Sequence, residues 1–541
     1  MNHSTTTNSD VTGSKRPVGT AAGVCSPSQY YTSRIGILSA RIVRHRRRNR
    51  LFVMGEILAF ALVVAFVTAY SMLQWGWAAV WPGLASLAAY VAIRRMDERN
   101  EARTEWLESL REVCRRESAY LEGDYSAFDD GKRYADPQHP FAADIDVFGT
   151  KSLYQRVCRT VTTGGSDRLA AMLLAEPVGQ QGCTGVHAET FDGALSPQER
   201  ICRRADAIEA LRHAAEWRTE FCAVGAGGKL CTDSVAQAMQ AVGGVKVQPF
   251  VTSPVAAVAA VFMCVGLLAA IVLAATTSMP SAVAVVWAIA QLGIVLGVCH
   301  AKLLKISGVV GKLQRQMAAY VKLLRMMGNG QGPVAAGNDV PELLARLMEA
   351  TRGAVETFHE MERILAGLDR RSNVLGLVFS DIFTLSDFRL LRRFAKCQSR
   401  CAENAGRWIA AVDNMDALVS MATFCYNEPC GVRAQVVDGD SVVFEAQGLY
   451  HPFLGEKAVT NDFSIAENNY YIVTGANMAG KSTFLRSLGI NWLLAMNGMP
   501  VFAHSLRLSV FPLFTSMRTT DDLTRGISSV SYTHLTLPTK A

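Results

Sequence analysis

The sequence predicts a chain with two apolar helical hairpins, a long all-α region and an incomplete α/β domain at its C-terminal end. Three observations support this fold class. Two long stretches lack charged side chains, the segments around them carry apolar residues at helical spacing, and from Gly431 the pattern changes to short β-like runs. Only 19% of the 541 residues are charged, below the roughly 25% of soluble domains, which favours membrane segments.

These patterns divide the chain into seven parts. We expect a disordered tail over 1–40, a basic segment with the first hairpin over 41–99, a helical region over 100–245, the second hairpin over 246–302, further helices over 303–428, an α/β domain over 429–530 and a non-native tail over 531–541. The first part is rich in Ser, Thr and Gly and has no apolar periodicity, which is typical of disorder.

The first hairpin is predicted from a run between Ile57 and Ala92 that contains no Asp, Glu, Lys or Arg. The run is long enough for two membrane spans of about 18–20 residues each. We place the turn near Trp75 and the segment Trp81-Pro82-Gly83, because tryptophans favour the membrane interface. The second run, Val247 to Ala301, suits two spans over about 254–275 and 281–299.

Cationic residues flank both hairpins on both sides. Arg41 to Arg50 contains six arginines before the first hairpin, Arg94-Arg95 closes it, and lysines flank the second at Lys246, Lys302 and Lys305. The positive-inside rule then places the N-terminus, the middle region and the C-terminal part on the cytoplasmic side of an inner or cytoplasmic membrane. The arginines are expected to contact anionic lipid headgroups. A nucleic-acid patch, and hairpins buried in a soluble core, are the alternatives.

Between and after the hairpins, amphipathic patterns predict helices. Their ranges are Glu101–Glu122, Leu153–Leu174, Glu199–His213, Leu303–Met327, Pro341–Ala366 and Asp387–Phe424, with a loop over 178–194. The helix over Asp387–Phe424 begins with a cluster of cations, Arg389, Arg392, Arg393, Lys396 and Arg400. A solvated helix face is the simpler interpretation of this cluster, and a phosphate-contacting stripe is the alternative.

The α/β domain is predicted from β-forming runs and a glycine-rich loop. The runs are 434–437, 441–445, 469–473, 505–510 and 513–517, and a helix is expected over 484–490. Thr474 to Thr483 reads T-G-A-N-M-A-G-K-S-T, which fits the P-loop pattern G-x-x-x-x-G-K-[ST]. A strand before it and a helix after it are the context that this motif requires.

The residue types of this loop suit ATP with Mg²⁺. Glycines allow backbone N–H groups to turn toward phosphate oxygens, Lys481 can reach the β- and γ-phosphates, and the Ser482 hydroxyl can ligate the metal. The predicted nucleotide-binding residues are Gly475, Ala476, Asn477, Met478, Ala479, Gly480, Lys481, Ser482 and Thr483.

The loop and its surroundings resemble the MutS ATPase family, whose pattern here is T-G-x-N-M-x-G-K-S-T-x-x-R. Asn477-Met478 makes the match more specific, and His451-Pro452 and Asp521 to Ser529 resemble two further family segments. The resemblance extends to Thr160-Val161-Thr162 and the residues after them, in what would be the helical core. It implies a homodimer that couples ATP binding and hydrolysis to conformational change. Ser528 would then act in trans at the partner's nucleotide.

Three departures from the family limit what the resemblance implies. Phe358-His359-Glu360 has the letters of a mismatch-reading wedge but falls inside an amphipathic helix, so we reject it. An adenine-stacking aromatic is missing, and Ala458 and Val459 stand nearest to its position. The N-terminal region holds a membrane hairpin instead. The chain therefore resembles a membrane-associated branch of the family, for which DNA is an open partner and mismatch reading is not expected.

The C-terminal end departs most from the family. After Ser529 the family continues to a Walker B strand, whereas residues 531–541 match no family pattern, which indicates a truncated chain with a foreign end. We expect this chain to bind ATP weakly and not to hydrolyse it, although whether it is an enzyme stays open. The alternatives are a structural membrane protein with a vestigial nucleotide site and an ATP-driven transporter component. The 13 cysteines show no C-x-x-C pair and are expected to be reduced thiols.

Overall fold

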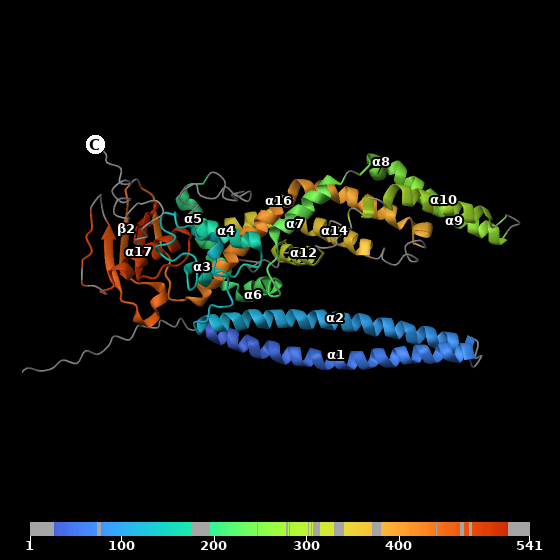
Figure 1. The fold of residues 1–541 in the computed structure, drawn as a ribbon, viewed down its shortest axis with the longest axis horizontal. Coiled ribbons are helices and arrows are strands. Elements are labelled where there is room, and N and C mark those ends of the chain that lie inside the picture. Colours follow the sequence, from blue (N-terminus) through green and yellow to red (C-terminus); the bar gives the residue numbers. More distant parts are fainter. Residues whose placement is uncertain are drawn as a thin grey trace, which may run out of the picture.

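The computed structural model describes residues 26–72, 77–174, 195–245, 247–276, 280, 282–300, 302–304, 306, 314–328, 340–369, 380–439, 441–465, 470–474, 476 and 479–517. Figure 1 shows an elongated molecule with a small sheet at one end and helices along the rest of its length. The predicted loop over 178–194 lies outside the described residues.

The first hairpin consists of two long antiparallel helices, α1 (Pro27–Met72) and α2 (Trp77–Leu121). The predicted tail over 1–40 is therefore wrong from residue 27 onward. The beginning of α1 is ordered by distant contacts, because the buried Tyr31 hydroxyl donates to Asn427 Oδ1 at 3.1 Å. The predicted turn residues Trp81-Pro82-Gly83 lie inside α2, where Pro82, in the second turn, has no N–H to donate to the helix.

The second hairpin consists of α9 (Pro254–Thr276) and α10 (Ala282–Val295), which continues as the π-helical turn η3 (Leu296–His300). These bounds confirm the helices predicted over 254–275 and 281–299. Among the described residues, three helices are long and apolar enough to cross a membrane: α1, α9, and α10 with its extension to Cys299. Figure 1 shows the far ends of both hairpins at the same end of the molecule, opposite the sheet.

A helical body lies between the sheet and the second hairpin, and the first hairpin runs alongside it (Figure 1). Its elements are η1 (Lys132–Tyr134), α3 (Leu153–Val157), α4 (Thr163–Leu173), α5 (Pro197–His213), α6 (Ala215–Val224), α7 (Thr232–Gly244), α8 (Pro249–Thr252), α12 (Gln314–Gly328), α13 (Glu342–Ala350), α14 (Ala354–Asp369) and α16 (Ser386–Asn427). The long helix α16 runs through the body and packs against most of the other helices. Its C-terminal half, around Met415 and Leu418, is almost completely buried.

Two predicted helices are each divided in the structure. The helix expected over 153–174 becomes α3 and α4, because residues 158–162 turn so that Thr162 can cap α4. The helix expected over 341–366 becomes α13 and α14, separated by a turn in which Gly353 has φ of 77°. A left-handed residue stops an α-helix, and local apolar spacing does not reveal such a stop.

The C-terminal region contains a four-stranded sheet of order β1-β4-β2-β3. Its elements are β1 (Gln435–Val437), β2 (Phe444–Leu449), η6 (Pro452–Lys457), β3 (Asn461–Ile465), α17 (Lys481–Met496) and β4 (Ser505–Ser509). Strand β1 is parallel to β4, and β2 is antiparallel to both β3 and β4. The runs 434–437 and 505–510 and the helix over 484–490 are confirmed. The run 441–445 forms a strand only from Phe444, and β3 was not predicted.

Two predicted strands are absent from the described residues. Residues 470–474 and 513–517 have irregular backbone, and the Tyr470 and Ile472 side chains are 100% and 87% exposed. A strand is stable only when another strand pairs with it, and neither segment has a hydrogen-bonded neighbour in this sheet. A local preference for β-structure was therefore not enough to place these residues in strands.

Candidate functional site

The glycine-rich loop leads directly into the N-terminus of α17. Gly480 caps this helix with φ of 86°, a conformation that L-residues with side chains avoid. The ammonium of Lys481 donates to the Ala476 carbonyl oxygen at 2.7 Å, so it folds back across the loop. Ser482 and Thr483 are exposed at the first turn of the helix. Gly475, Asn477, Met478 and Ser528 lie outside the described residues.

These features fit a phosphate group. The first N–H groups of α17 have no partner within the helix, and they stand beside an ammonium and two exposed hydroxyls. Ser482 is the residue that would hold Mg²⁺, and Lys481 can exchange its contact with a backbone carbonyl for one with a phosphate oxygen. No cluster of three or more metal-binding side chains occurs in the part of the chain that the structure describes.

A buried asparagine fixes α17 against the sheet. The Asn491 amide donates to the Tyr450 carbonyl oxygen at 3.1 Å, and its Oδ1 accepts from the Phe502 N–H at 2.6 Å. Closer to the loop, Arg486 forms an ion pair with Asp146 at 3.3 Å. Asn491 was not predicted, and its only signal in the sequence is that it is a polar residue on the apolar face of a helix.

His451, which belongs to the predicted family segment His451-Pro452, has a structural role in the described residues. Its Nδ1 accepts from the Phe453 N–H at 3.3 Å and so caps η6. Burial, together with the charges of Arg156 and Arg486, lowers the pKa of His451 to about 4. The ring is therefore neutral at physiological pH and accepts this hydrogen bond without competition from a proton.

Two buried carboxylates join α16 to the N-terminus of α4. Asp416 accepts from the Val161 N–H at 3.0 Å, and from the N–H and hydroxyl of Thr162 at 2.8 Å each. Asp413 accepts from the same Thr162 hydroxyl at 3.1 Å. A Cβ at Gly165 would collide with the Asp416 carboxylate, so the close approach requires glycine there. Thr162 was among the residues predicted to belong to the helical core, whereas neither aspartate was predicted.

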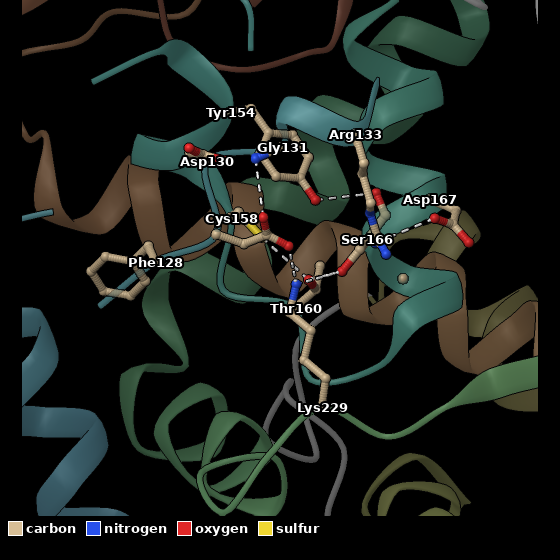
Figure 2. Close-up of polar contacts among 12 residues, drawn as sticks. Phe128, Asp130, Gly131, Arg133, Tyr154, Cys158, Thr160, Ser166, Asp167 and Lys229 are labelled. Carbon is tan, nitrogen blue, oxygen red and sulfur yellow. Dashed lines mark hydrogen bonds and ion pairs between the residues drawn. The ribbon is translucent and has the colours of Figure 1, made fainter. Parts of the chain in front are cut away.

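A second polar cluster lies beside this joint (Figure 2). The Lys229 ammonium donates to Asp129 at 2.7 Å and to the Ser166 hydroxyl at 2.9 Å, and Ser166 is 2.6 Å from the Thr160 hydroxyl. The ion pair between Lys229 and Asp129 joins the segment before α3 to the helical body, so we assign the cluster a structural role.

The cations at the beginning of α16 lie mostly in solvent. Arg389, Lys396 and Arg400 are exposed, and Arg393 is 3.8 Å from Glu360. Arg392 donates to the Thr252 carbonyl oxygen of α8 at 3.4 Å. The rejected wedge residue Phe358 is buried against Trp408, with ring centroids 5.6 Å apart, and cannot stack on an external base.

Comparisons with known proteins match the C-terminal region. Residues 471–535 match the family model of MutS domain V. The DNA mismatch repair protein MutS of Caulobacter vibrioides is 34% identical over 151 residues, which cover 26% of this chain and 16% of that protein. Those of Thermus aquaticus and Persephonella marina are 34% and 30% identical over 145 and 148 residues, each 26% of this chain and 17% of the relative.

The matched region includes the glycine-rich loop and the start of α17, where the predicted family residues stand. The chain spans about one sixth of the length of these relatives. Since this match covers the glycine-rich loop and Asp521 to Ser529, two of the segments that carry the resemblance, the chain is a MutS-like protein.

Proposed function

We propose that this protein is a membrane-anchored MutS-like ATP-binding protein. One observation carries the proposal: the far ends of both hairpins lie at one end of an elongated molecule, and α17, which follows the glycine-rich loop, lies at the other (Figure 1). Large apolar side chains such as Leu58, Trp81 and Val258 are 63%, 70% and 69% exposed. Continuous apolar surface of this kind is unstable in water and suits the interior of a bilayer.

Nucleotide binding would use the loop at the beginning of α17. Lys481 would neutralise phosphate charge, the N–H groups of α17 would donate to phosphate oxygens, and Ser482 would hold the Mg²⁺ ion. When bound, ATP would supply the free energy that is released when its γ-phosphate is cleaved. The family resemblance implies a homodimer in which Ser528 would act at the partner's nucleotide. Hydrolysis, dimerisation and DNA binding are parts of the proposal that need separate assays.

Helix α16 offers a path between the two ends of the molecule. Its 42 residues correspond to about 60 Å of continuous helix. It leads into β1 of the sheet at one end, and at the other Arg392 contacts α8, directly before the second hairpin. We infer that nucleotide-dependent movement of the sheet region would reach the second hairpin through this helix.

The test of nucleotide binding compares wild-type protein with Lys481→Ala. Titration with a fluorescent ATP analogue should show at least a tenfold loss of affinity in the variant, because a charged contact to phosphate is removed. Lys151→Ala, an exposed lysine of the helical body, is the matched control and should bind as wild type. Equal affinities of wild type and Lys481→Ala would reject the nucleotide site and favour a structural membrane protein.

Membrane anchoring is tested separately. Membranes that contain the protein are extracted with alkaline carbonate, which releases peripheral proteins and leaves integral ones in the pellet. Recovery of the protein in the soluble fraction would contradict the proposed anchor. DNA binding is tested by titrating duplex DNA at several salt concentrations, and absence of binding even at low salt would exclude DNA as a partner.

A further inference from the structure

Ten exposed arginines lie on the two helices of the first hairpin, on either side of the contact between His45 and Asn100 along the helices. We call them the arginine band: Arg41, Arg44, Arg46, Arg47, Arg48 and Arg50 on α1, and Arg94, Arg95, Arg99 and Arg103 on α2. The sequence separates the two groups by more than 40 residues, and the antiparallel pairing of the helices brings them together. His45 Nδ1 lies 2.7 Å from Asn100 Oδ1, and Arg94 reaches Glu56 at 3.5 Å, which fixes this register.

Most of this charge is not neutralised within the protein. Arg46 pairs with Glu108 at 2.5 Å, and Arg94 pairs with Glu56 and Glu98. The other eight arginines have no carboxylate within ion-pair distance in the described part of the chain. Exposed guanidinium groups at this density repel one another, so an external anion that bridges them would be stabilising.

The band directly adjoins bare apolar surface. Leu51, Met54 and Ile57 follow it on α1 and are 67%, 67% and 65% exposed. On α2 the apolar half of the helix precedes Arg94, with Val91 exposed at its end. A ligand that covers both surfaces must have an anionic part next to an apolar part. Duplex DNA meets the first condition only, because it would leave the apolar surface in water.

We propose that the arginine band is a binding site for the phosphate groups of anionic phospholipids on one face of the membrane. Guanidinium groups suit this ligand because their parallel N–H groups bind two phosphate oxygens at once. Positions on both helices let several headgroups surround the hairpin while their acyl chains lie along its apolar half. This inference rests on the proposed membrane anchoring and adds selectivity for lipid charge.

The test uses the full chain in mild detergent, titrated with short-chain phosphatidylglycerol or phosphatidylcholine, with bound lipid counted by native mass spectrometry. Wild-type protein should bind phosphatidylglycerol with clear preference. The triple variant with Arg44→Gln, Arg47→Gln and Arg48→Gln should lose at least tenfold in affinity for phosphatidylglycerol, since each basic residue near an anionic surface contributes about fivefold. Its affinity for phosphatidylcholine should not change.

Two further variants show whether a loss of binding comes from the charge of the arginine band. The triple variant with Lys151→Gln, Arg352→Gln and Arg407→Gln removes the same charge from exposed positions of the helical body and should retain the preference. Replacing Arg44, Arg47 and Arg48 with lysine keeps the charge and should retain most of the binding, which separates a loss of charge from misfolding. Equal affinity of wild-type protein for both lipids would overturn the inference.

A separate measurement distinguishes a lack of lipid preference from a failure of the hairpins to anchor the protein in a membrane. Wild-type protein is reconstituted with vesicles of pure phosphatidylcholine and floated on a density gradient. If it floats but shows no preference for phosphatidylglycerol, only the arginine band is refuted as a lipid site. If it does not float, the membrane anchor itself fails. Tighter binding of a 30-base-pair duplex than of phosphatidylglycerol, lost in the band variant, would assign the band to nucleic acid instead.

Discussion

The buried carboxyl pair between α16 and α4 leads to a prediction about pH. Thr162 has one hydroxyl proton, yet its oxygen lies within hydrogen-bond distance of both Asp413 and Asp416. Asp416 also accepts from two backbone N–H groups, whereas the buried Asp413 Oδ2 has no hydrogen-bond partner among the described residues. Asp413 is therefore the carboxyl that stays protonated. Burial, and then the charge of Asp416, raise the pKa of Asp413 to about 8.

The pKa of Asp416 is also raised, to about 6, mainly by burial, while its hydrogen bonds from Val161 and Thr162 act in the opposite direction. Both folded-state values lie above the value of 3.8 for an ordinary Asp side chain. The folded protein therefore holds more protons than the unfolded chain between about pH 4 and pH 8. Stability from this pair is greatest at the acidic end of that range and is lost as the pH rises through the folded-state pKa values.

The size of the effect follows from these shifts. The pKa shift of Asp413 alone corresponds to at most about 6 kcal/mol in the free energy of unfolding. Water that enters beside the ionised pair reduces this contribution. We expect wild-type protein to lose about 2–3 kcal/mol of local stability between pH 5 and pH 9. Asn has the shape of a neutral Asp side chain, so Asp413→Asn should remain within about 1 kcal/mol of wild type at pH 5 and become more stable than wild type at pH 9.

The assay is hydrogen–deuterium exchange of the peptide that contains Val161 to Leu169, with protection corrected for intrinsic exchange at each pH. This peptide includes the first turns of α4, which the carboxyl pair holds. Asp233→Asn, an exposed carboxyl in the first turn of α7, is the control and should not change protection in this peptide. Wild-type protection that is constant from pH 5 to pH 9, or a large loss in Asp413→Asn at pH 5, would refute the reasoning.

Three further predictions concern single residues. Gly480→Ala should lower the free energy of unfolding by about 1–2 kcal/mol, because φ is 86° and an added Cβ meets no atom of the described residues, which leaves backbone strain as the cost. An unchanged thermal midpoint and nucleotide affinity would contradict this. Asn491→Ala should cost about 2–3 kcal/mol in denaturant unfolding, because the buried Phe502 N–H loses its acceptor, and a cost below about 0.5 kcal/mol would argue against that bond. Glu117→Ala should lower the free energy of unfolding, measured with denaturant, by about 3–5 kcal/mol, because it leaves the buried Arg159 without its carboxylate partner. Stability equal to wild type would show that water reaches this ion pair.

Local patterns were sufficient for the helices of the second hairpin and for the presence of a helix after the glycine-rich loop. An uncharged apolar run fixes helix length through side-chain hydropathy alone, so α9 and α10 agree with their predicted ranges. Gly480 before Lys481 marks the start of α17 in the same local way, because the left-handed backbone requires glycine. Membrane crossing and ATP binding remain predictions.

Strand pairing and helix breaks could not be predicted because they depend on distant residues. The β-forming run at 470–473 is irregular, since none of the described strands pairs with it, whereas the less obvious run Asn461–Ile465 forms β3 against β2. Residues 27–40 had the composition of a tail. They fold because Tyr31 reaches Asn427, almost 400 positions away along the chain.

The sequence by itself therefore determined the kinds of segment that this protein contains: apolar helices, a glycine-rich loop that resembles the MutS family, and arginines beside a hydrophobic run. Tertiary structure decided which of these residues meet. Antiparallel pairing of α1 and α2 joins two arginine groups into one band, and packing of α16 on α4 places Asp413 and Asp416 around Thr162. Hydropathy and backbone preference act between near neighbours, whereas charge and hydrogen bonding in the folded chain depend on residues brought together from far apart.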